Sequence, residues 1–376
     1  MQGFAALDIG NHGWKGVNSQ RCQYIPANLI EVDEDTYHRH NPNGLNPDAC
    51  VIDGRHRILF GATAKKIQRH SPRGAARYEP GFYDFAVVIM LANLYQRSMD
   101  DLTLLLTYSP LFSAYTDEMI RVVKRTGRTA RSKRKNDGYW EIEIGGKQLN
   151  FRIQRAGVKP EPVAALYNLQ LTDDYKVAQN GLTQGSAIII DLGGHTTDYA
   201  FCEDGLVENG SAFALDEGMF GVEVRFQDFL REAYPEAFRK GGIRSSRLHD
   251  AMATGIYRGG LLRGDLPVEE QRRRAMEPHI DDMMNLFTAY YGFDVSHILM
   301  AGGGGLAAQP YFEERLRDEF LRTRGREGRA RLESMDKAGE TFTRLATDNP
   351  NELHYAVVFG AFKMLQVLRA KGIFDD

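Results

Sequence analysis

One short segment combines an apolar strand with a glycine turn, and it constrains the fold more than any other feature of the chain. Residues 188–199 read Ile-Ile-Ile-Asp-Leu-Gly-Gly-His-Thr-Thr-Asp-Tyr. The isoleucines favour a buried strand, and Gly193 and Gly194 permit a tight turn. Such a turn brings backbone N–H groups close to an anion, and Asp191 places a carboxylate where a phosphate-bound Mg²⁺ would sit. Taken alone, the segment also fits a plain β-hairpin without a ligand.

A second copy of this plan near the N-terminus favours the ligand-binding interpretation. Residues 4–16 again place an apolar strand before an aspartate, Asp8, followed by a glycine-containing turn and a returning strand. Lys15 in this copy adds a cation suited to phosphate oxygens. Two such hairpins, about 180 residues apart, predict two related halves that act on one nucleotide. No stretch of the chain matches the P-loop pattern G-x-x-x-x-G-K-[ST].

Length and composition narrow the class of protein. The 376 residues allow roughly two or three domains, and 43% hydrophobic residues is ordinary for a soluble globular protein. With 47 basic and 50 acidic residues the net charge is −3, so no overall basic field predicts nucleic-acid binding. The three cysteines lack metal-ligand spacing and indicate reduced thiols. No apolar run is long enough for a membrane span or a signal peptide, so we predict a cytoplasmic protein.

Three further segments carry separate predictions. Residues 121–135 hold eight Lys or Arg and no acidic residue, which fits either a solvated helix end or contact with an acidic protein. Nucleic-acid contact is less favoured there because aromatic residues that could stack on bases are missing. A helix is predicted over 310–321, followed by a charged, mobile segment over 322–339. Gly360, in a helix predicted over 353–370, indicates close packing against another helix.

Two other sites lie at the ends of predicted elements. The strand before residues 302–305 ends in four glycines and leads into a helix, a place where a ligand can touch the backbone. Pro162 suits the first turn of a helix, so Glu161 is expected at the entrance of that helix, outside the core.

In this order, the hairpin at Asp8, the hairpin at Asp191 and the strand with glycines at 298–305 resemble the actin and heat-shock-chaperone ATPase superfamily. The resemblance covers nearly the whole chain. It implies the α/β actin-like ATPase fold, in which two related domains close on ATP and Mg²⁺. We expect the first domain to comprise residues 1–158 plus 345–376, with a small subdomain at 31–80, and the second to comprise residues 159–344.

The resemblance also implies roles for individual residues. Asp8 and Asp191 would be the carboxylates near the metal, and Lys15 would bind phosphate. The two turns would contact the phosphates through Gly10, Asn11, His12, Gly13, Gly193, Gly194, His195 and Thr196. At His195 many relatives have another small or polar residue. The ribose and adenine contacts would be Glu217, Gly218, Gly302, Gly303 and Gly304.

For hydrolysis, a water must be positioned and polarised in line with the γ-phosphate. Glu161 matches the position where actins and their relatives carry Gln or Glu for this purpose. Asp198 aligns with a second water-contacting position, and with Asp191 these residues form the implied catalytic set. Alternatively, the Glu161 carboxylate only interacts favourably with the dipole of its own helix.

Within the superfamily, the short insert at 31–80 looks most like the ParM-type plasmid-segregation actins and their archaeal relatives. That resemblance implies an ATPase that polymerises into filaments for plasmid segregation or intracellular positioning. An adaptor protein would connect the filament to DNA, with no membrane contact and no direct nucleic-acid binding expected. A second hypothesis is an ATP-driven regulator that does not polymerise, such as a chaperone, a reactivase or a small-molecule kinase.

Overall fold

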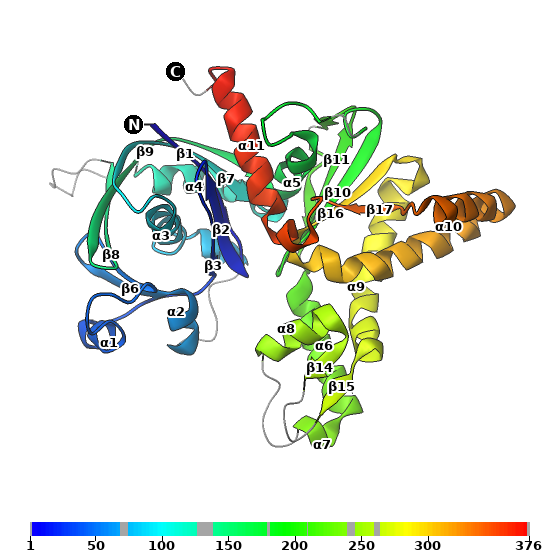
Figure 1. Ribbon diagram of the computed structural model, residues 1–376, viewed down its shortest axis with the longest axis horizontal. Helices are drawn as coiled ribbons and strands as arrows, with labels where there is room; N and C mark the ends of the chain where they lie inside the picture. The colour runs from blue at the N-terminus through cyan, green and yellow to red at the C-terminus, as the bar shows by residue number, and fades with distance from the viewer. Residues whose placement is uncertain are drawn as a thin grey trace. The chain divides into compact units, whose positions relative to one another are not determined.

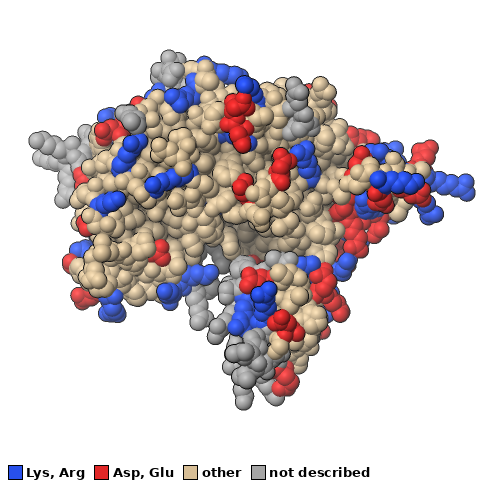
Figure 2. Space-filling model, viewed as in Figure 1, with Lys and Arg blue, Asp and Glu red and all other residues tan. Residues whose placement is uncertain are grey.

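The computed structural model describes residues 2–67, 74–125, 138–178, 181–208, 210–238, 245–258 and 264–373. The chain divides into two compact units (Figure 1). Unit 1 comprises residues 1–178 and 355–376, and unit 2 comprises residues 179–354. On the face shown in Figure 2 basic and acidic side chains are interspersed, in keeping with the small net charge of −3. Among the described residues, no helix is both long enough and apolar enough to span a bilayer.

The chain passes from unit 1 to unit 2 and back again, and both boundaries differ from those of the predicted domains. Residues 159–178 belong to unit 1, and residues 345–354 belong to unit 2. Residues 159–178 join unit 1 through helix packing, because α5 (Glu161–Gln170) lies against α11 (Ala356–Ala370). A side chain at Gly360 would collide with the Ala164 carbonyl oxygen, which confirms the predicted close helix contact.

Unit 1 is built on one large mixed sheet with the strand order β3-β2-β1-β7-β9-β8-β5-β6-β4. The bounds are β1 (Gln2–Ile9), β2 (Gly13–Asn18), β3 (Cys22–Pro26), β4 (Leu29–Glu31), β5 (Ala49–Ile52), β6 (His56–Phe60), β7 (Met99–Tyr108), β8 (Tyr139–Ile144) and β9 (Lys147–Pro160). At its centre, β7 pairs in parallel with β1 and with β9. The C-terminal ends of β1 and β9 therefore lie at the same edge of the sheet, the edge where α/β folds bind ligands.

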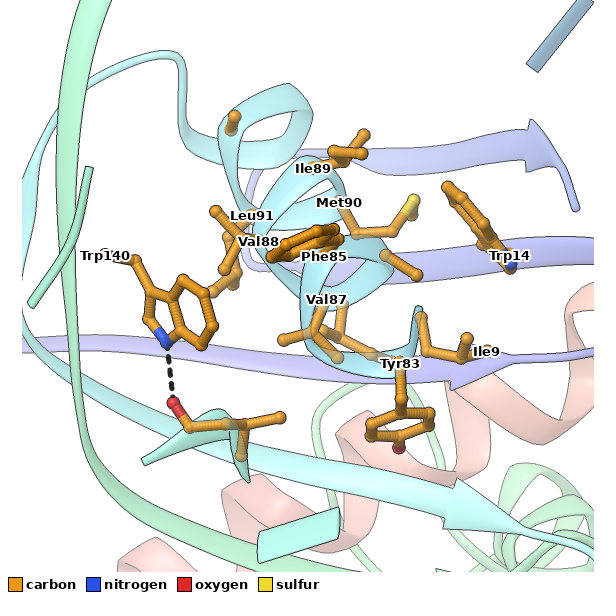
Figure 3. Close-up of a cluster of buried hydrophobic side chains, with 14 of the residues drawn as sticks. Ile9, Trp14, Tyr83, Phe85, Val87, Val88, Ile89, Met90, Leu91 and Trp140 are labelled. Carbon is orange, nitrogen blue, oxygen red and sulfur yellow. Dashed lines mark hydrogen bonds between the residues drawn. The ribbon is translucent and has the colours of Figure 1, made fainter. Parts of the chain in front are cut away.

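The core of unit 1 is assembled around α3 (Tyr83–Tyr95), an apolar helix buried on nearly all sides. Figure 3 shows α3 between Trp140, which comes from β8, and Trp14, which comes from β2. Phe85 meets the Trp140 ring edge to face at 6.5 Å. The remaining helical segments are α1 (Glu34–His40), α2 (Gly61–Ile67), η1 (Gly74–Tyr78), η2 (Pro110–Tyr115) and α4 (Thr116–Val123).

Unit 2 has a smaller sheet with the order β12-β11-β10-β16-β17, in which β13 also pairs with β11. The bounds are β10 (Ser186–Leu192), β11 (Thr197–Glu203), β12 (Leu206–Val207), β13 (Phe213–Leu215), β16 (His297–Ala301) and β17 (Thr343–Leu345), and β14 (Ile256–Arg258) and β15 (Asp265–Pro267) form a separate pair. The helical segments are α6 (Met219–Ala233), α7 (Pro235–Phe238), α8 (Ser245–Thr254), α9 (Glu269–Tyr290), η3 (Gly292–Asp294), α10 (Gly302–Ala338) and η4 (Pro350–Tyr355). The predicted strand–turn–strand over 188–199 is confirmed as the antiparallel β10–β11 hairpin.

The longest helix departs from the sequence prediction. A helix was predicted over 310–321 and a mobile charged segment over 322–339, but α10 runs from Gly302 to Ala338. Gly325, with φ 55° and ψ −124°, is non-helical and divides α10 into two helical runs. Since glycine adopts positive φ without a Cβ clash, the chain reverses there and helix resumes immediately after it. In Figure 1, α10 extends away from the sheet of unit 2.

Candidate functional site

The first predicted hairpin brings Asp8 and Lys15 directly opposite each other on β1 and β2. Residues opposite each other in an antiparallel pair point to the same face, and here Lys15 Nζ donates to Asp8 Oδ2 at 2.7 Å. The Asp8 side chain is 4% exposed. Its second oxygen, Oδ1, is buried without a hydrogen-bond partner among the described residues. An orphaned buried carboxylate oxygen is a position suited to a ligand or an ordered water.

The turn of this hairpin contains the residues predicted to contact phosphate, Gly10 to Gly13. Gly13 lies directly under the Tyr24 ring, so a side chain at this position would require Tyr24 to move. The His12 carbonyl accepts a hydrogen bond from Ala27 N at 3.2 Å. Asn11 Oδ1 accepts from Gly74 N at 3.3 Å, so this side chain connects the turn to η1.

Glu161, the first residue of α5, is 8% exposed. The expectation that it lies outside the core is therefore wrong. Local sequence placed it correctly at a helix entrance, but tertiary packing buries that entrance. A buried carboxylate is costly unless a cation or hydrogen-bond donors accompany it.

The cation beside Glu161 is Arg77, a residue that sequence reasoning missed. Arg77 lies in η1, is 3% exposed, and places Nη2 at 3.6 Å from Glu161 Oε1. It also donates to the Tyr78 hydroxyl. Burial acts to lower the pKa of Arg77, but Tyr78, Glu161 and Asp8 outweigh it, and the pKa rises above its ordinary value. An arginine among small residues in a loop was the only sequence signal.

The second hairpin brings Asp191 and Asp198 directly opposite each other on β10 and β11. Their spacing of seven residues is that of Asp8 and Lys15, but this pair combines two carboxylates. They are 4% and 1% exposed. Oxygen ligands of this kind are those that Mg²⁺ prefers, so the residues present fit such an ion. Two adjacent buried carboxylates repel each other unless a cation or a proton intervenes.

The turn over 193–196 is packed tightly against the start of α6. Its carbonyl oxygens on Gly193 and Gly194 accept from Met219 N at 3.1 Å and Phe220 N at 2.8 Å. A Cβ at Gly218 would lie 2.7 Å from the Gly193 oxygen, so Gly218 is required for this packing. Gly218, a predicted nucleotide contact, is thus also needed for the packing of the turn against α6. His195 Nε2 lies 3.2 Å from Asp216 Oδ1.

A buried histidine, also missed by sequence reasoning, lies behind the second hairpin. Thr197 Oγ1 donates its one hydrogen to the Glu217 carbonyl at 2.8 Å, so His279 Nε2–H must donate to Thr197 at 3.1 Å. His279 is fully buried, and its Nδ1 has no hydrogen-bond partner in the described part of the chain. Burial lowers the pKa of His279, which favours the neutral ring. The Glu217 carboxylate is held by Arg225 at 2.6 Å.

The glycines after β16 approach the second hairpin closely. β16 runs parallel to β10, with Ala301 paired to Asp191. A side chain at Gly302, whose φ is +75°, would collide with Asp191 Oδ1 and with the backbone of Leu192. Gly303 has open space around it, so its backbone is accessible to a ligand.

Comparison with known proteins identifies the fold of the chain. No family model matches the sequence, and no curated protein matches it either. Solved structures do match over nearly the whole chain. The actin-like protein Alp7A is 14% identical, with 100% of this chain and 99% of that chain covered and a TM-score of 0.70. The chain has the actin fold. A Bacillus thuringiensis ParM with ATP (14% identity, 98% and 99% covered, TM-score 0.62) shares it.

Another structure with the actin fold is a 15-stranded ParM filament from Clostridium botulinum, 13% identical, with 97% of this chain and 99% of that chain covered and a TM-score of 0.65. The chain therefore resembles ParM-type proteins in structure. Within this actin fold, the predicted residues gather in each unit by itself. Asp8 and Lys15 lie together in unit 1, where Arg77 holds Glu161, and Asp191, Asp198 and Gly302 lie together in unit 2.

Of the basic stretch over 121–135, residues 126–135 lie outside the described residues. Arg125, which is described, pairs with Asp53 and lies over the Trp140 ring, with its guanidinium carbon 3.5 Å from the ring centroid. Arg121 pairs with Glu118 on its own helix. These two arginines are thus engaged within unit 1.

Proposed function

We propose that the chain binds ATP with Mg²⁺ and hydrolyses the bond between the β- and γ-phosphates, using both hairpins. The observation that carries this proposal is the repeated, buried Asp at the end of a strand, facing a charged residue seven positions later. Asp8 and Asp191 are proposed as the carboxylates that hold the metal, and Lys15 as a phosphate ligand. When bound, Mg²⁺ would supply positive charge at the phosphate oxygens.

The proposed catalytic groups are three carboxylates with different surroundings. Glu161 and Asp198 would orient the attacking water and accept its proton. Asp191 would complete this catalytic set while also holding the metal. Arg77 is proposed to hold the Glu161 carboxylate in one orientation, because a buried guanidinium has few other positions to adopt. The backbone N–H groups of residues 10–13 and 193–196 would contact phosphate, and Glu217, Gly218 and Gly302 to Gly304 would lie at the nucleoside.

We further propose that the chain assembles into filaments that segregate plasmid DNA or position a cargo in the cytoplasm, through an adaptor protein. Support comes from the actin fold it shares with the Clostridium botulinum ParM filament. A head-to-tail interface that does not close on itself yields a filament.

The test compares Glu161→Ala with Glu143→Ala, a control on the exposed face of β8 in the same unit. Removing a proton acceptor costs about 10²- to 10⁴-fold in turnover, so Glu161→Ala should release phosphate that much more slowly. It should still bind ATP and pellet with ATP, because assembly depends on binding. Glu143→Ala should behave like the parent protein.

Phosphate release is followed by a continuous assay, and assembly by pelleting and light scattering with ATP, ADP and a non-hydrolysable analogue. Normal turnover of Glu161→Ala would remove Glu161 from the catalytic role. A parent protein that hydrolyses ATP yet stays monomeric with every nucleotide would instead support the regulator hypothesis.

A further inference from the structure

The outer end of α10 concentrates positive charge that the composition of the whole chain conceals. We name residues 322–331 the arginine tip. Its sequence, Arg-Thr-Arg-Gly-Arg-Glu-Gly-Arg-Ala-Arg, holds five arginines, one glutamate and no lysine, a formal charge of +4 in a chain whose net charge is −3. All five arginines are exposed. Figure 2 shows basic side chains at the outer end of α10.

The arginine tip is held in place by the fold. Gly325 reverses the chain, and a side chain at Gly328 would lie 3.1 Å from the Phe320 carbonyl, so the second helical run returns close along the first. Leu332 and Met335 of the returning run are buried. The tip is therefore the end of a packed helical hairpin.

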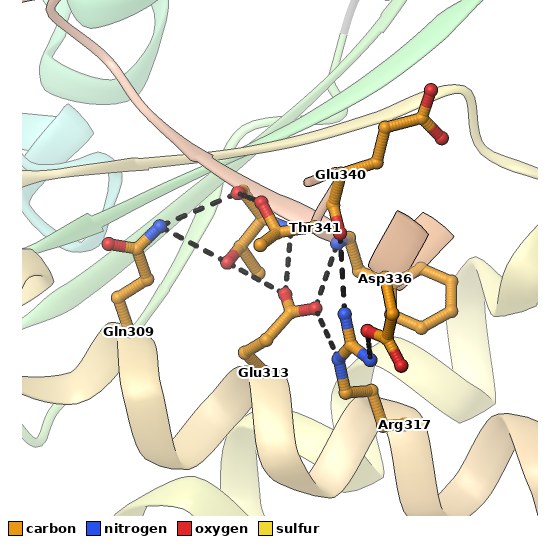
Figure 4. A network of polar contacts seen from close by, with 8 residues as sticks. Gln309, Glu313, Arg317, Asp336, Glu340 and Thr341 are labelled. Carbon is orange, nitrogen blue, oxygen red and sulfur yellow. Dashed lines mark hydrogen bonds and ion pairs between the residues drawn. The ribbon is translucent and has the colours of Figure 1, made fainter. Parts of the chain in front are cut away.

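A polar network fixes the base of this hairpin to the sheet (Figure 4). Glu313 accepts hydrogen bonds from the backbone N–H groups of Phe342 and Thr343, both at 2.9 Å. Arg317 donates to Glu313 at 3.1 Å and to Asp336 at 2.7 Å, which connects the two helical runs. The hairpin that carries the arginines is thus hydrogen-bonded to the sheet at its base.

Most arginines of the tip are weakly engaged within the molecule. Arg322 is the exception, since it donates to both oxygens of the half-buried Glu319, at 2.8 and 2.5 Å. Arg331 contacts Glu340 at 3.4 Å and Arg324 contacts Asp294 at 3.2 Å, both pairs at exposed positions. Exposed pairs of this kind contribute about 0–1 kcal/mol, so a polyanion can replace them.

The remaining two arginines, Arg326 and Arg329, have no carboxylate within ion-pair distance among the described residues. Their guanidinium groups are thus available to an anionic partner without first giving up an ion pair.

The composition of the tip selects among partners. Protein interfaces use aromatic or large apolar anchors, and membrane-surface segments insert apolar side chains, but residues 322–331 contain neither. Single-stranded nucleic acid is bound through aromatic stacking, which is also missing here. Arginine forms bidentate hydrogen bonds with phosphate, and a duplex backbone can be bound by such contacts alone.

We propose that the arginine tip binds the phosphate backbone of double-stranded DNA without regard to sequence. This goes beyond the proposed ATPase and does not depend on it. It also departs from the expectation of no direct nucleic-acid contact, because that expectation used the net charge, whereas binding depends on the local charge. One tip binds weakly; copies arrayed in an assembly would bind with avidity.

The test measures fluorescence anisotropy of a labelled duplex of arbitrary sequence with the full chain, without nucleotide. Affinity falls with salt by a logarithmic slope of about −0.9 per phosphate neutralised, so four contacts predict roughly a hundredfold loss between about 50 and 200 mM salt. Neutralising two arginines, in Arg326→Gln/Arg329→Gln, should reduce that slope by about two. Arg326→Lys/Arg329→Lys should retain most of the affinity, because backbone binding needs charge.

The matched control is Arg231→Gln/Arg274→Gln, which removes two exposed arginines of unit 2 outside the tip. It should bind duplex like the parent. Equal loss in the control, or no duplex binding at about 50 mM salt, would overturn the proposal.

Other polyanions separate the remaining explanations. Polyglutamate binding as tight as the duplex would assign the tip to an acidic protein, and binding only to phosphatidylserine vesicles would assign it to a membrane. Either result overturns the proposal. ATP hydrolysis by the Arg326→Gln/Arg329→Gln variant should equal that of the parent, so failure of the tip and failure of the proposed ATPase are separate observations.

Discussion

The two hairpins of this protein share a plan but differ in charge. In each, an aspartate at the end of one strand lies directly opposite the residue seven positions later, so that Lys15 faces Asp8 and Asp198 faces Asp191. Because opposite side chains lie on one face, the first pair attracts and the second repels. In unit 1 a second buried carboxylate also has a cation beside it, since Arg77 lies next to Glu161.

Because of this difference, a bound cation should stabilise the two units to different extents. A buried carboxylate paired with a cation is stable on its own, whereas two facing carboxylates gain most from a bound cation. We therefore expect Mg²⁺ to stabilise unit 2 more than unit 1. The two tryptophans, Trp14 and Trp140, both lie in the core of unit 1. Tryptophan fluorescence thus follows the unfolding of unit 1, and calorimetry follows both units.

The largest change in stability is expected for Arg77→Met. It leaves the Glu161 carboxylate buried without its cation, and breaking a buried pair in this way costs about 3–5 kcal/mol. The midpoint of urea unfolding, followed by tryptophan fluorescence, should fall accordingly. Arg77→Lys, which keeps the charge, should fall less.

A double variant checks that the cost comes from this pair. In Arg77→Met/Glu161→Gln the uncompensated charge is gone, so part of the lost stability should return. If the double variant is less stable than Arg77→Met by the full cost of Glu161→Gln alone, the two side chains do not interact, and the contrast between the units loses one of its two supports.

A substitution made at both hairpins should change stability in opposite directions. Asp8→Asn removes a charged hydrogen bond and should lower the stability of unit 1 by about 1.5–3 kcal/mol. Asp198→Asn removes a like-charge pair and should raise the stability of unit 2, without divalent cations, by up to about 1 kcal/mol. Fluorescence measures the first and calorimetry the second.

Added Mg²⁺ sharpens this comparison. The ion should stabilise the parent protein more than Asp198→Asn, because a ligand that binds the folded state more tightly raises its stability more at the same concentration. If both aspartate variants are destabilised and Mg²⁺ affects them alike, the Asp191–Asp198 pair is not a site of repulsion.

Sequence predicts the hairpins well because their chemistry is local. The strand residues, the glycine turn and the seven-residue spacing together specify the register that brings Asp8 to Lys15 and Asp191 to Asp198. Arg77 could not be predicted in the same way, since its partner Glu161 lies on another element and no periodicity marks a loop.

Two errors have the same origin in tertiary packing. A carboxylate at a helix entrance is normally solvated, but the entrance at which Glu161 lies is buried, with Arg77 beside it. Gly325 resembles a helix stop, and it does end one helical run, yet Leu332 and Met335 pack in the core and sustain a second run beyond it. Local rules placed Glu161 at a helix entrance and ended the helix at residue 321, but they could not supply the neighbours that decided either outcome.

The smallest effect is expected at His279, which lies behind the second hairpin. Its folded-state pKa is lowered by burial, so below about pH 6.5 the unfolded chain binds a proton that the folded chain resists. The stability associated with a neutral His279 is therefore present above that pH and is lost as pH falls through the folded-state pKa. His279→Gln should lower the calorimetric midpoint of unit 2 at pH 7, yet make it less dependent on pH between 7 and 5.

His297, whose pKa burial also lowers, provides the control. Because His297 is only partly buried, His297→Gln should flatten the pH profile less. An unchanged pH dependence in His279→Gln would mean that the acid sensitivity of unit 2 does not arise at His279.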